Sequence, residues 1–313
     1  MTDTGIATAT LPPRHDTRRL FGLLLAAAGS IAFAGKAIII KLAYRHGVDA
    51  ITLIMLRMLF ALPFFVAMSA WAGRGQPALR ARDWRMVFVL GFTGYYLASF
   101  LDFAGLAYVS AGLERLVLYL NPTLVMILGR VLFKRPVSAR QFAALAVSYA
   151  GAVLVFGHEA HLGGSHVVLG TALVLGSAVS YAVYLVFSGE EVKRLGSLRL
   201  TGLASTVACL LCIAQFALLR PWSVAFVSPA VIGLSVLNAT ACTVAPILML
   251  MMAIERVGAP TAALTGMIGP VSTIAMGAIF LGEAFTPWVA VGTGAVLLGI
   301  GILSISPRQG RVH

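Results

Sequence analysis

The sequence predicts an all-α integral membrane protein with ten transmembrane helices, arranged as two inverted five-helix repeats. Of its 313 residues, 59% are hydrophobic and only 11% are charged, which is more apolar material than a soluble core takes up. Ten apolar stretches are long enough to cross about 30 Å of hydrocarbon. The chain also matches itself at a constant offset of 148 residues. Because each copy holds an odd number of spans, the second copy enters the bilayer in the opposite sense.

The first repeat, residues 19–157, is predicted to contain five spans, near 19–42, 50–72, 84–108, 110–132 and 138–157. The second repeat, residues 167–306, is predicted to contain the other five, near 167–188, 198–219, 229–253, 257–281 and 286–306. The connections are short, so we expect no sizeable soluble domain. We expect residues 1–18 and 307–313 to be a cytoplasmic N-terminal segment and C-terminal tail, without a cleavable signal peptide.

The repeat is visible in pairs of residues that share a type at the fixed offset, including Gly22 with Gly170, Phe33 with Tyr181, Val109 with Val257, Leu116 with Leu264, Pro122 with Pro270, Gly129 with Gly277 and Gly151 with Gly299. An inverted repeat of this kind occurs in many secondary transporters. The duplication therefore predicts movement of a solute.

The net charge of +12 follows the membrane topology. Sixteen basic residues fall on the side that holds the N-terminus, and only Lys41, Arg45 and Arg220 fall on the other side. The positive-inside rule then places both termini in the cytoplasm, and we expect the bacterial inner (plasma) membrane. No soluble segment carries a basic stripe with interleaved aromatic residues, so we expect no nucleic-acid partner.

The cysteines and histidines give little support for a metal or a cofactor, and we expect neither. Cys209 and Cys212 have a C-x-x-C spacing on an apolar helix, which favours packing. Three histidines share one predicted external loop with Glu159, and their spacing is wrong for a two-histidine zinc helix: His158, His161 and His166. We interpret this segment as a solvated loop.

Five ionisable residues cluster in the predicted outer half of the bilayer: Lys36, Arg57, Asp102, Glu114 and Arg115. Such groups cost at least ~2.5–3.5 kcal/mol each in hydrocarbon, so they normally face a cavity or one another. All five belong to the first repeat. Their counterparts in the second repeat are uncharged: Tyr184, Ser205, Leu250, Ala262 and Ala263. The two repeats therefore differ at the positions where we expect substrate to bind.

Helical spacing adds aromatic and polar neighbours to this cluster. The predicted substrate-binding residues are Phe33, Lys36, Tyr95, Ser99, Asp102, Glu114, Arg115, Tyr119, Asn121, Tyr181, Tyr184, Asn238 and Thr265. Pro122 and Pro270 lie near the middle of their spans, where each can kink its helix, and we interpret them as hinges, with simple packing as the alternative. The charged residues have an alternative role as a structural or gating network, and Arg57 and Arg130 are the first candidates for a structural or interfacial role.

Diffuse motifs in both repeats resemble the EamA-type members of the drug/metabolite transporter superfamily, over roughly residues 19–306. In the first repeat they are Ala107 to Val109, Leu116, Asn121-Pro122, Gly129 and Gly151, and in the second Val257, Leu264, Gly269-Pro270, Gly277, Gly282-Glu283 and Gly299. The first repeat departs from the pattern, with Lys134-Arg135 in place of Gly282-Glu283. The resemblance implies a central cavity lined by the first four helices of each repeat, with the fifth and tenth outside. It also implies export of metabolites, in particular amino acids, including aromatic ones.

The cluster's charges suit a zwitterion, because three positive and two negative groups leave a surplus of only one positive charge. An amino acid would place its carboxylate near Lys36 or Arg115 and its ammonium near Asp102 or Glu114. We therefore expect a secondary transporter that exports small metabolites, amino acids foremost, by alternating access. Export of drugs or other metabolites, a channel, and an intramembrane enzyme are the alternatives, the last without a G-x-S-x-G elbow or an intramembrane histidine. Direction, proton coupling and oligomeric state stay open.

Overall fold

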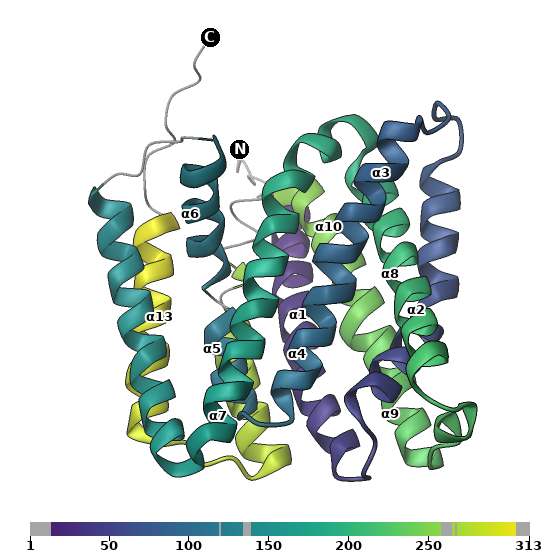
Figure 1. Cartoon of the computed structure of the whole chain (residues 1–313). Coiled ribbons are helices and arrows are strands. Elements are labelled where there is room, and N and C mark those ends of the chain that lie inside the picture. Colours follow the sequence, from purple (N-terminus) through teal and green to yellow (C-terminus); the bar gives the residue numbers. More distant parts are fainter. Residues whose placement is uncertain (1–13, 119, 134–138, 258–264, 267, 305–313) are drawn as a thin grey trace, which may run out of the picture.

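The computed structural model (Figure 1) describes residues 14–118, 120–133, 139–257, 265–266 and 268–304. Within these ranges all regular structure is helical. Among the described residues, seven segments are long and apolar enough to cross a membrane, and three shorter apolar helices, 146–158, 271–281 and 287–299, accompany them. The predicted all-α fold with ten membrane helices in two repeats is confirmed.

The first four spans of the first repeat are α1 (Arg14–Tyr44), α2 (Ala50–Ala72), a third span made of α3 (Ala81–Leu90), the π-helical segment η1 (Gly91–Leu97) and α4 (Ala98–Leu106), and a fourth made of α5 (Ala111–Leu118) and α6 (Asn121–Phe133). Asp49 begins α2, because its carboxylate accepts hydrogen bonds from the amides of Ile51 and Thr52 at 2.9 and 3.1 Å. The fourth span is divided just before Pro122, where one continuous helix was predicted.

The fifth and sixth spans form one helical element, α7 (Ala139–Leu195), of 57 residues. A straight helix of that length would measure about 85 Å at 1.5 Å per residue, far beyond a bilayer. Figure 1 shows instead that its ribbon descends at the edge of the bundle, turns and returns beside α4 and α5. The predicted solvated loop at 158–166 is therefore wrong, because this connection is helical.

The remaining elements of the second repeat are α8 (Ser197–Leu219), the short 3-10 helix η2 (Trp222–Ala225), α9 (Pro229–Ala239), η3 (Thr240–Val244), α10 (Ala245–Val257), α12 (Ile268–Met276), η4 (Gly277–Leu281) and α13 (Pro287–Ser304). Ser228 begins α9, and its hydroxyl accepts a hydrogen bond from the amide of Val231 at 3.5 Å. The segments η3 and η4 are π-helical, like η1.

The two repeats interleave. A Cβ on Gly22 of α1 would lie 2.7 Å from the Val257 side chain, and a Cβ on Gly170 of α7 would lie 2.8 Å from that of Val109. Gly170 and Val257 are the counterparts of Gly22 and Val109 at the offset of 148. In each repeat, therefore, the first helix packs against the other repeat. Accordingly, α1 packs mainly along α10 and α12, and α4 packs along α7.

The π-helical segments also follow the repeat, because the offset of 148 maps η1 onto residues 239–245, which contain η3. A π turn leaves carbonyl groups without their usual helical partners. Side chains supply donors at these places: Ser180 donates to the Thr93 carbonyl and Ser177 to the Ala98 carbonyl, each at 2.7 Å, and Thr243 donates to the Asn238 carbonyl at 2.8 Å. The sequence analysis did not predict these segments.

The fifth and tenth helices pack closely on one flank of the bundle, where α13 lies beside the first half of α7 (Figure 1). A Cβ on Gly151 would lie 2.5 Å from the Gly292 carbonyl oxygen, and a Cβ on Gly292 would lie 2.6 Å from the Gly151 carbonyl oxygen. Two backbones in such contact leave no room for a side chain on either glycine.

Candidate functional site

Four predicted site residues from three helices meet in a buried group, which we call the charged cluster: Lys36, Asp102, Glu114 and Arg115. The Lys36 ammonium donates a hydrogen bond to Asp102 Oδ2 at 2.5 Å and lies 3.6 Å from Glu114 Oε1. Arg115 Nε lies 3.7 Å from Glu114 Oε2. The cluster therefore joins α1, α4 and α5 through opposite charges, with Glu114 fully buried at 0% exposure.

Phe33 lies beside the cluster, one turn before Lys36 on α1. Its ring centroid is 5.4 Å from the Lys36 ammonium and 5.5 Å from the centre of the Arg115 guanidinium, so both cations make cation–π contacts with it. The ring is also partly exposed. Phe33 thus supplies an apolar surface next to the charges.

The charged cluster leaves several buried polar atoms without a hydrogen bond: Asp102 Oδ1, both carboxylate oxygens of Glu114, and Nε and Nη2 of Arg115. The ion-pair distances of 3.6 and 3.7 Å are too long for hydrogen bonds. Each buried polar atom without a partner costs about 1–3 kcal/mol. The cluster has acceptors and donors for a ligand that carries both charges.

Arg57 lies near this group but is held by protein contacts. Its Nε donates to the Thr243 hydroxyl at 3.0 Å, and its guanidinium stacks over the Phe103 ring at 5.2 Å from the centroid. Thr243 lies in η3, whose Cys242 faces α1 at Gly35, next to Lys36. The side-chain amide of Asn238, also on this span, is buried and makes no hydrogen bond.

The predicted tyrosines form a separate tyrosine cluster of Tyr95, Tyr181 and Tyr184. The hydroxyls of Tyr95 and Tyr184 are 3.2 Å apart, and their ring centroids are 5.1 Å apart in an edge-to-face arrangement. The Tyr181 ring stacks on that of Tyr184 at 5.4 Å. Tyr181 and Tyr184 are the repeat counterparts of Phe33 and Lys36. The second repeat thus has an aromatic group at the place where the first has charges.

The remaining predicted residues do not join either group by a described contact. Ser99 on α4 is partly buried, Asn121 begins α6 with its side-chain carbonyl oxygen unbonded, and Thr265 is partly buried. The backbones of Pro122 and Pro270 lie in α6 and α12. Tyr119 lies outside the described residues.

At the end of the bundle where α7 meets α8, an ion network joins the third and sixth spans. Arg194 pairs with Asp83 and, at 2.5 Å, with Glu191, and Arg82 lies 4.0 Å from Glu191. The hydrogen bonds that Arg194 makes to Glu191 and Asp83 raise the pKa of its guanidinium. Arg199 on α8 donates to the Pro77 carbonyl at 3.0 Å. We call this the α7–α8 end and define the ion network as Arg82, Asp83, Glu191 and Arg194.

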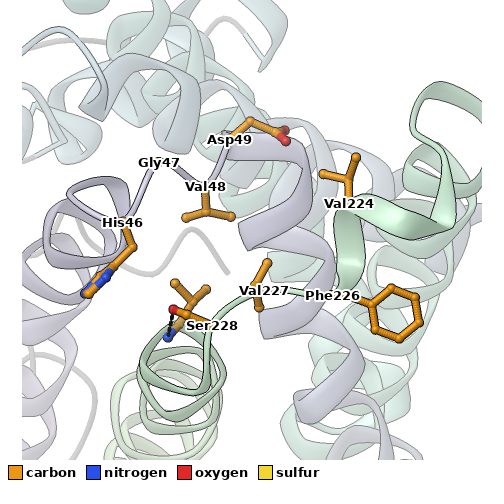
Figure 2. Close-up of a pocket in the computed structure, with 9 residues that line it drawn as sticks. His46, Gly47, Val48, Asp49, Val224, Phe226, Val227 and Ser228 are labelled. Atoms are coloured by element: carbon orange, nitrogen blue, oxygen red, sulfur yellow. Dashed lines mark hydrogen bonds between the residues drawn. The ribbon is translucent and has the colours of Figure 1, made fainter.

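The opposite end, where α1 meets α2, has a pocket of about 270 Å³ between the connections α1–α2 and η2–α9 (Figure 2). It is lined by His46, Gly47, Val48, Asp49, Val224, Phe226, Val227, Ser228 and Val231. At the offset of 148, His46 corresponds to Arg194 and Val231 to Asp83. The pocket therefore occupies the place that the Arg194–Asp83 ion pair occupies at the other end.

Glu283 links the two repeats at the α1–α2 end, a contact that the sequence analysis missed. Its carboxylate accepts a hydrogen bond from the backbone amide of Ala111 at 2.9 Å and lies 3.9 Å from Lys41. Gly282 before it has φ +71°, a left-handed conformation that glycine adopts without strain. Arg45 also donates to the Leu281 carbonyl at 2.8 Å. The Gly282-Glu283 motif marks this position in the sequence, but it does not indicate which residues the Glu283 carboxylate contacts.

Within the described residues, no group of three or more His, Cys, Asp or Glu side chains has the arrangement of a metal site. His158 stacks on Trp288, and His166 stacks on Tyr108. All three cysteines are buried and free.

Comparison with known protein families identifies the family, and the relatives and a solved structure agree with a transporter and with this fold. Residues 20–157 and 168–305 each match the EamA-like transporter family. The "Uncharacterized transporter YcbK" of Bacillus subtilis is 31% identical over 286 residues, which cover 89% of this chain and 91% of that protein. The "Uncharacterized transporter YetK" of the same organism is 21% identical over 296 residues, which cover 93% of this chain and 89% of that protein. A solved crystal structure, described only as that of a protein, superposes with a TM-score of 0.62 at 18% identity, covering 90% of this chain and 96% of its own.

Proposed function

Because the chain belongs to the EamA-like transporter family, we propose that it exports small zwitterionic metabolites, amino acids foremost, by alternating access at the charged cluster. The protein is an integral membrane transporter and not an enzyme. The identity of the solute and the direction of transport are the proposed part. The charge asymmetry of the connections supports cytoplasmic termini, and with them an α7–α8 end that faces the cytoplasm.

The observation that supports this proposal is the set of unbonded atoms in the charged cluster. Asp102 and Glu114 offer acceptors to an ammonium group, and Arg115 offers two donors to a carboxylate. Phe33 offers a ring surface to an apolar or aromatic side chain. An anionic substrate such as a sugar phosphate fits less well, because the two carboxylates would repel it.

Alternating access requires two ends that open in turn, and the two ends of this molecule differ. The ion network joins the spans at the α7–α8 end, while the corresponding place at the α1–α2 end is a pocket. The α1–α2 end is bridged at other places, by Glu283 with Lys41 and Ala111 and by Arg220 with Asp49. The ion network supports a state in which the cytoplasmic end is held closed, and these contacts would hold the other end. Transport would then break the ion network as the helices rearrange around the cluster.

Uptake of labelled amino acids into proteoliposomes tests the proposal. Wild type is expected to show saturable flux of at least one amino acid. Asp102→Asn and Arg115→Gln are each expected to lower flux at subsaturating substrate by about 10- to 150-fold, the worth of one hydrogen bond to a charged group. Arg74→Gln removes an exposed arginine from the α2–α3 connection and should leave flux unchanged. Flux of a drug panel with no flux of any amino acid would refute the amino-acid assignment, and unitary currents would indicate a channel.

A further inference from the structure

We propose that Lys36 is a built-in substitute for the substrate's ammonium group: in the empty site it occupies the position between Asp102 and Glu114, and the substrate's ammonium must displace it. This inference rests on the proposed function and assigns the two charged ends of the substrate. The ammonium binds at Asp102 and Glu114 in place of Lys36, and the carboxylate binds at Arg115.

The geometry of the acid pair is the first support. Lys36 Nζ lies within 2.5 Å of Asp102 and 3.6 Å of Glu114, as the ammonium group of a bound ligand would. Only one of these contacts is a hydrogen bond, and three carboxylate oxygens stay unbonded. One lysine therefore satisfies the two acids incompletely, which leaves acceptors for a competing ammonium group.

The side chain of Lys36 suits displacement. An ammonium on a flexible four-carbon stem can move several ångströms, whereas a planar guanidinium is held by its fixed donor geometry. Lys36 already makes a cation–π contact with the Phe33 ring at 5.4 Å, and a displaced ammonium group can keep this contact. Arg115 in contrast keeps two unbonded donors beside Glu114, which suits it to bind a carboxylate.

The position of Lys36 gives its displacement a structural consequence. Lys36 lies on α1, which packs mainly along α10 and α12, while Asp102 lies on α4, which packs along α7. The Lys36–Asp102 ion pair therefore joins two groups of helices from different parts of the bundle. A substrate that takes the place of Lys36 breaks this ion pair. The two groups are then joined less firmly, through contacts such as the hydrogen bond from the Tyr44 hydroxyl of α1 to the Phe103 carbonyl of α4 at 2.5 Å.

The test compares matched ligands that carry both charges or only one. Phenylalanine, phenethylamine and 3-phenylpropionate share one aromatic body, and leucine, 3-methylbutylamine and 4-methylpentanoate share one aliphatic body. Binding of each is measured to purified wild type and to Lys36→Met, which keeps an unbranched side chain one atom shorter and removes its charge. The inference predicts that K36M binds the amine-only ligands about tenfold tighter or more, because no internal cation competes. Binding of the carboxylate-only ligands should change little.

The opposite assignment, in which Lys36 binds the substrate's carboxylate, predicts a different pattern. K36M would then weaken binding of the amino acids and of the carboxylate-only ligands and leave the amines unchanged, and this result overturns the inference. Because K36M leaves two carboxylates opposite one arginine, a charge-balanced comparison is needed as well. K36M/D102N and wild type both leave the cluster neutral, and K36M/D102N should bind amines more tightly than wild type, since Lys36 then no longer covers Glu114.

The inference and the proposed function fail in distinguishable ways. Saturable amino-acid flux in wild type, together with amine binding that K36M and K36M/D102N do not tighten, overturns the role of Lys36 alone. No amino-acid flux in wild type and no amine binding to any variant overturns both. Tighter amine binding in both variants supports the inference even where the best-transported amino acid is neither phenylalanine nor leucine.

Discussion

Substitution of Glu283 should loosen the start of α5, the helix that carries Glu114 and Arg115. The Glu283 carboxylate is the acceptor for the Ala111 amide, one of the amides that a helix start leaves without an internal partner. Glu283→Gln keeps an acceptor oxygen and loses the charge at the positive helix end, worth about 0.3–1 kcal/mol. It also loses the partly exposed Lys41 pair, worth about 0–1 kcal/mol. Glu283→Ala loses the hydrogen bond as well, for a total of about 2 kcal/mol.

Hydrogen exchange measures this effect directly, because local opening sets the exchange rate of protected amides. A loss of 1–2 kcal/mol corresponds to roughly 5- to 30-fold faster opening. The amides at the start of α5 should therefore exchange about fivefold faster in Glu283→Gln and about thirtyfold faster in Glu283→Ala. The α13 peptide, residues 287–304, should be unchanged. Equal exchange of α5 in Glu283→Ala and wild type would refute this role, and a uniform increase across the chain would show general destabilisation instead.

Two further substitutions test other contacts. Gly292→Ala should lower the free energy of unfolding by about 1–3 kcal/mol, because its Cβ would meet the Gly151 carbonyl at 2.6 Å. Thermal unfolding in detergent measures this loss. Gly294→Ala is a matched control expected to be neutral, because a Cβ there would have no neighbouring atom within 4 Å. Arg194→Gln should favour opening of the α7–α8 end, because the ion network loses its central cation. A cysteine placed at the buried Ser205, in a background without the native cysteines, should then react several-fold faster with a maleimide from that side, and an unchanged rate would contradict a closing role for the network.

Hydropathy and the internal repeat were enough to predict the spans, because every span must offer the lipid an apolar surface whatever its partners. The same reasoning predicted that the charged residues lie together, since Lys36 and Asp102 are too costly in hydrocarbon to lie apart. This reasoning could not predict that the connection at 158–166 is helical. A helical connection and a loop can have the same mixture of glycine, histidine and apolar residues.

The separation of the tyrosine cluster from the charged cluster has a different cause. Tyr95, Ser99 and Asp102 share a face only if the third span keeps 3.6 residues per turn. Tyr95 lies in η1, where the wider π turn changes the register between it and Asp102. A π segment has no composition of its own, so the sequence offered no sign of the change. Glu283 and Ala111 are 172 residues apart, and only the fold brings them together.

The interleaving of the repeats affects the order in which the protein can be completed during synthesis. Helix α1 emerges from the ribosome first, yet its main packing partners, α10 and α12, are among the last segments to be made. Until then Gly22 and the face around it have only lipid or provisional neighbours. A truncated product that ends after the first repeat would expose these same faces. The ancestral single copy would have needed a second, oppositely inserted copy to cover them.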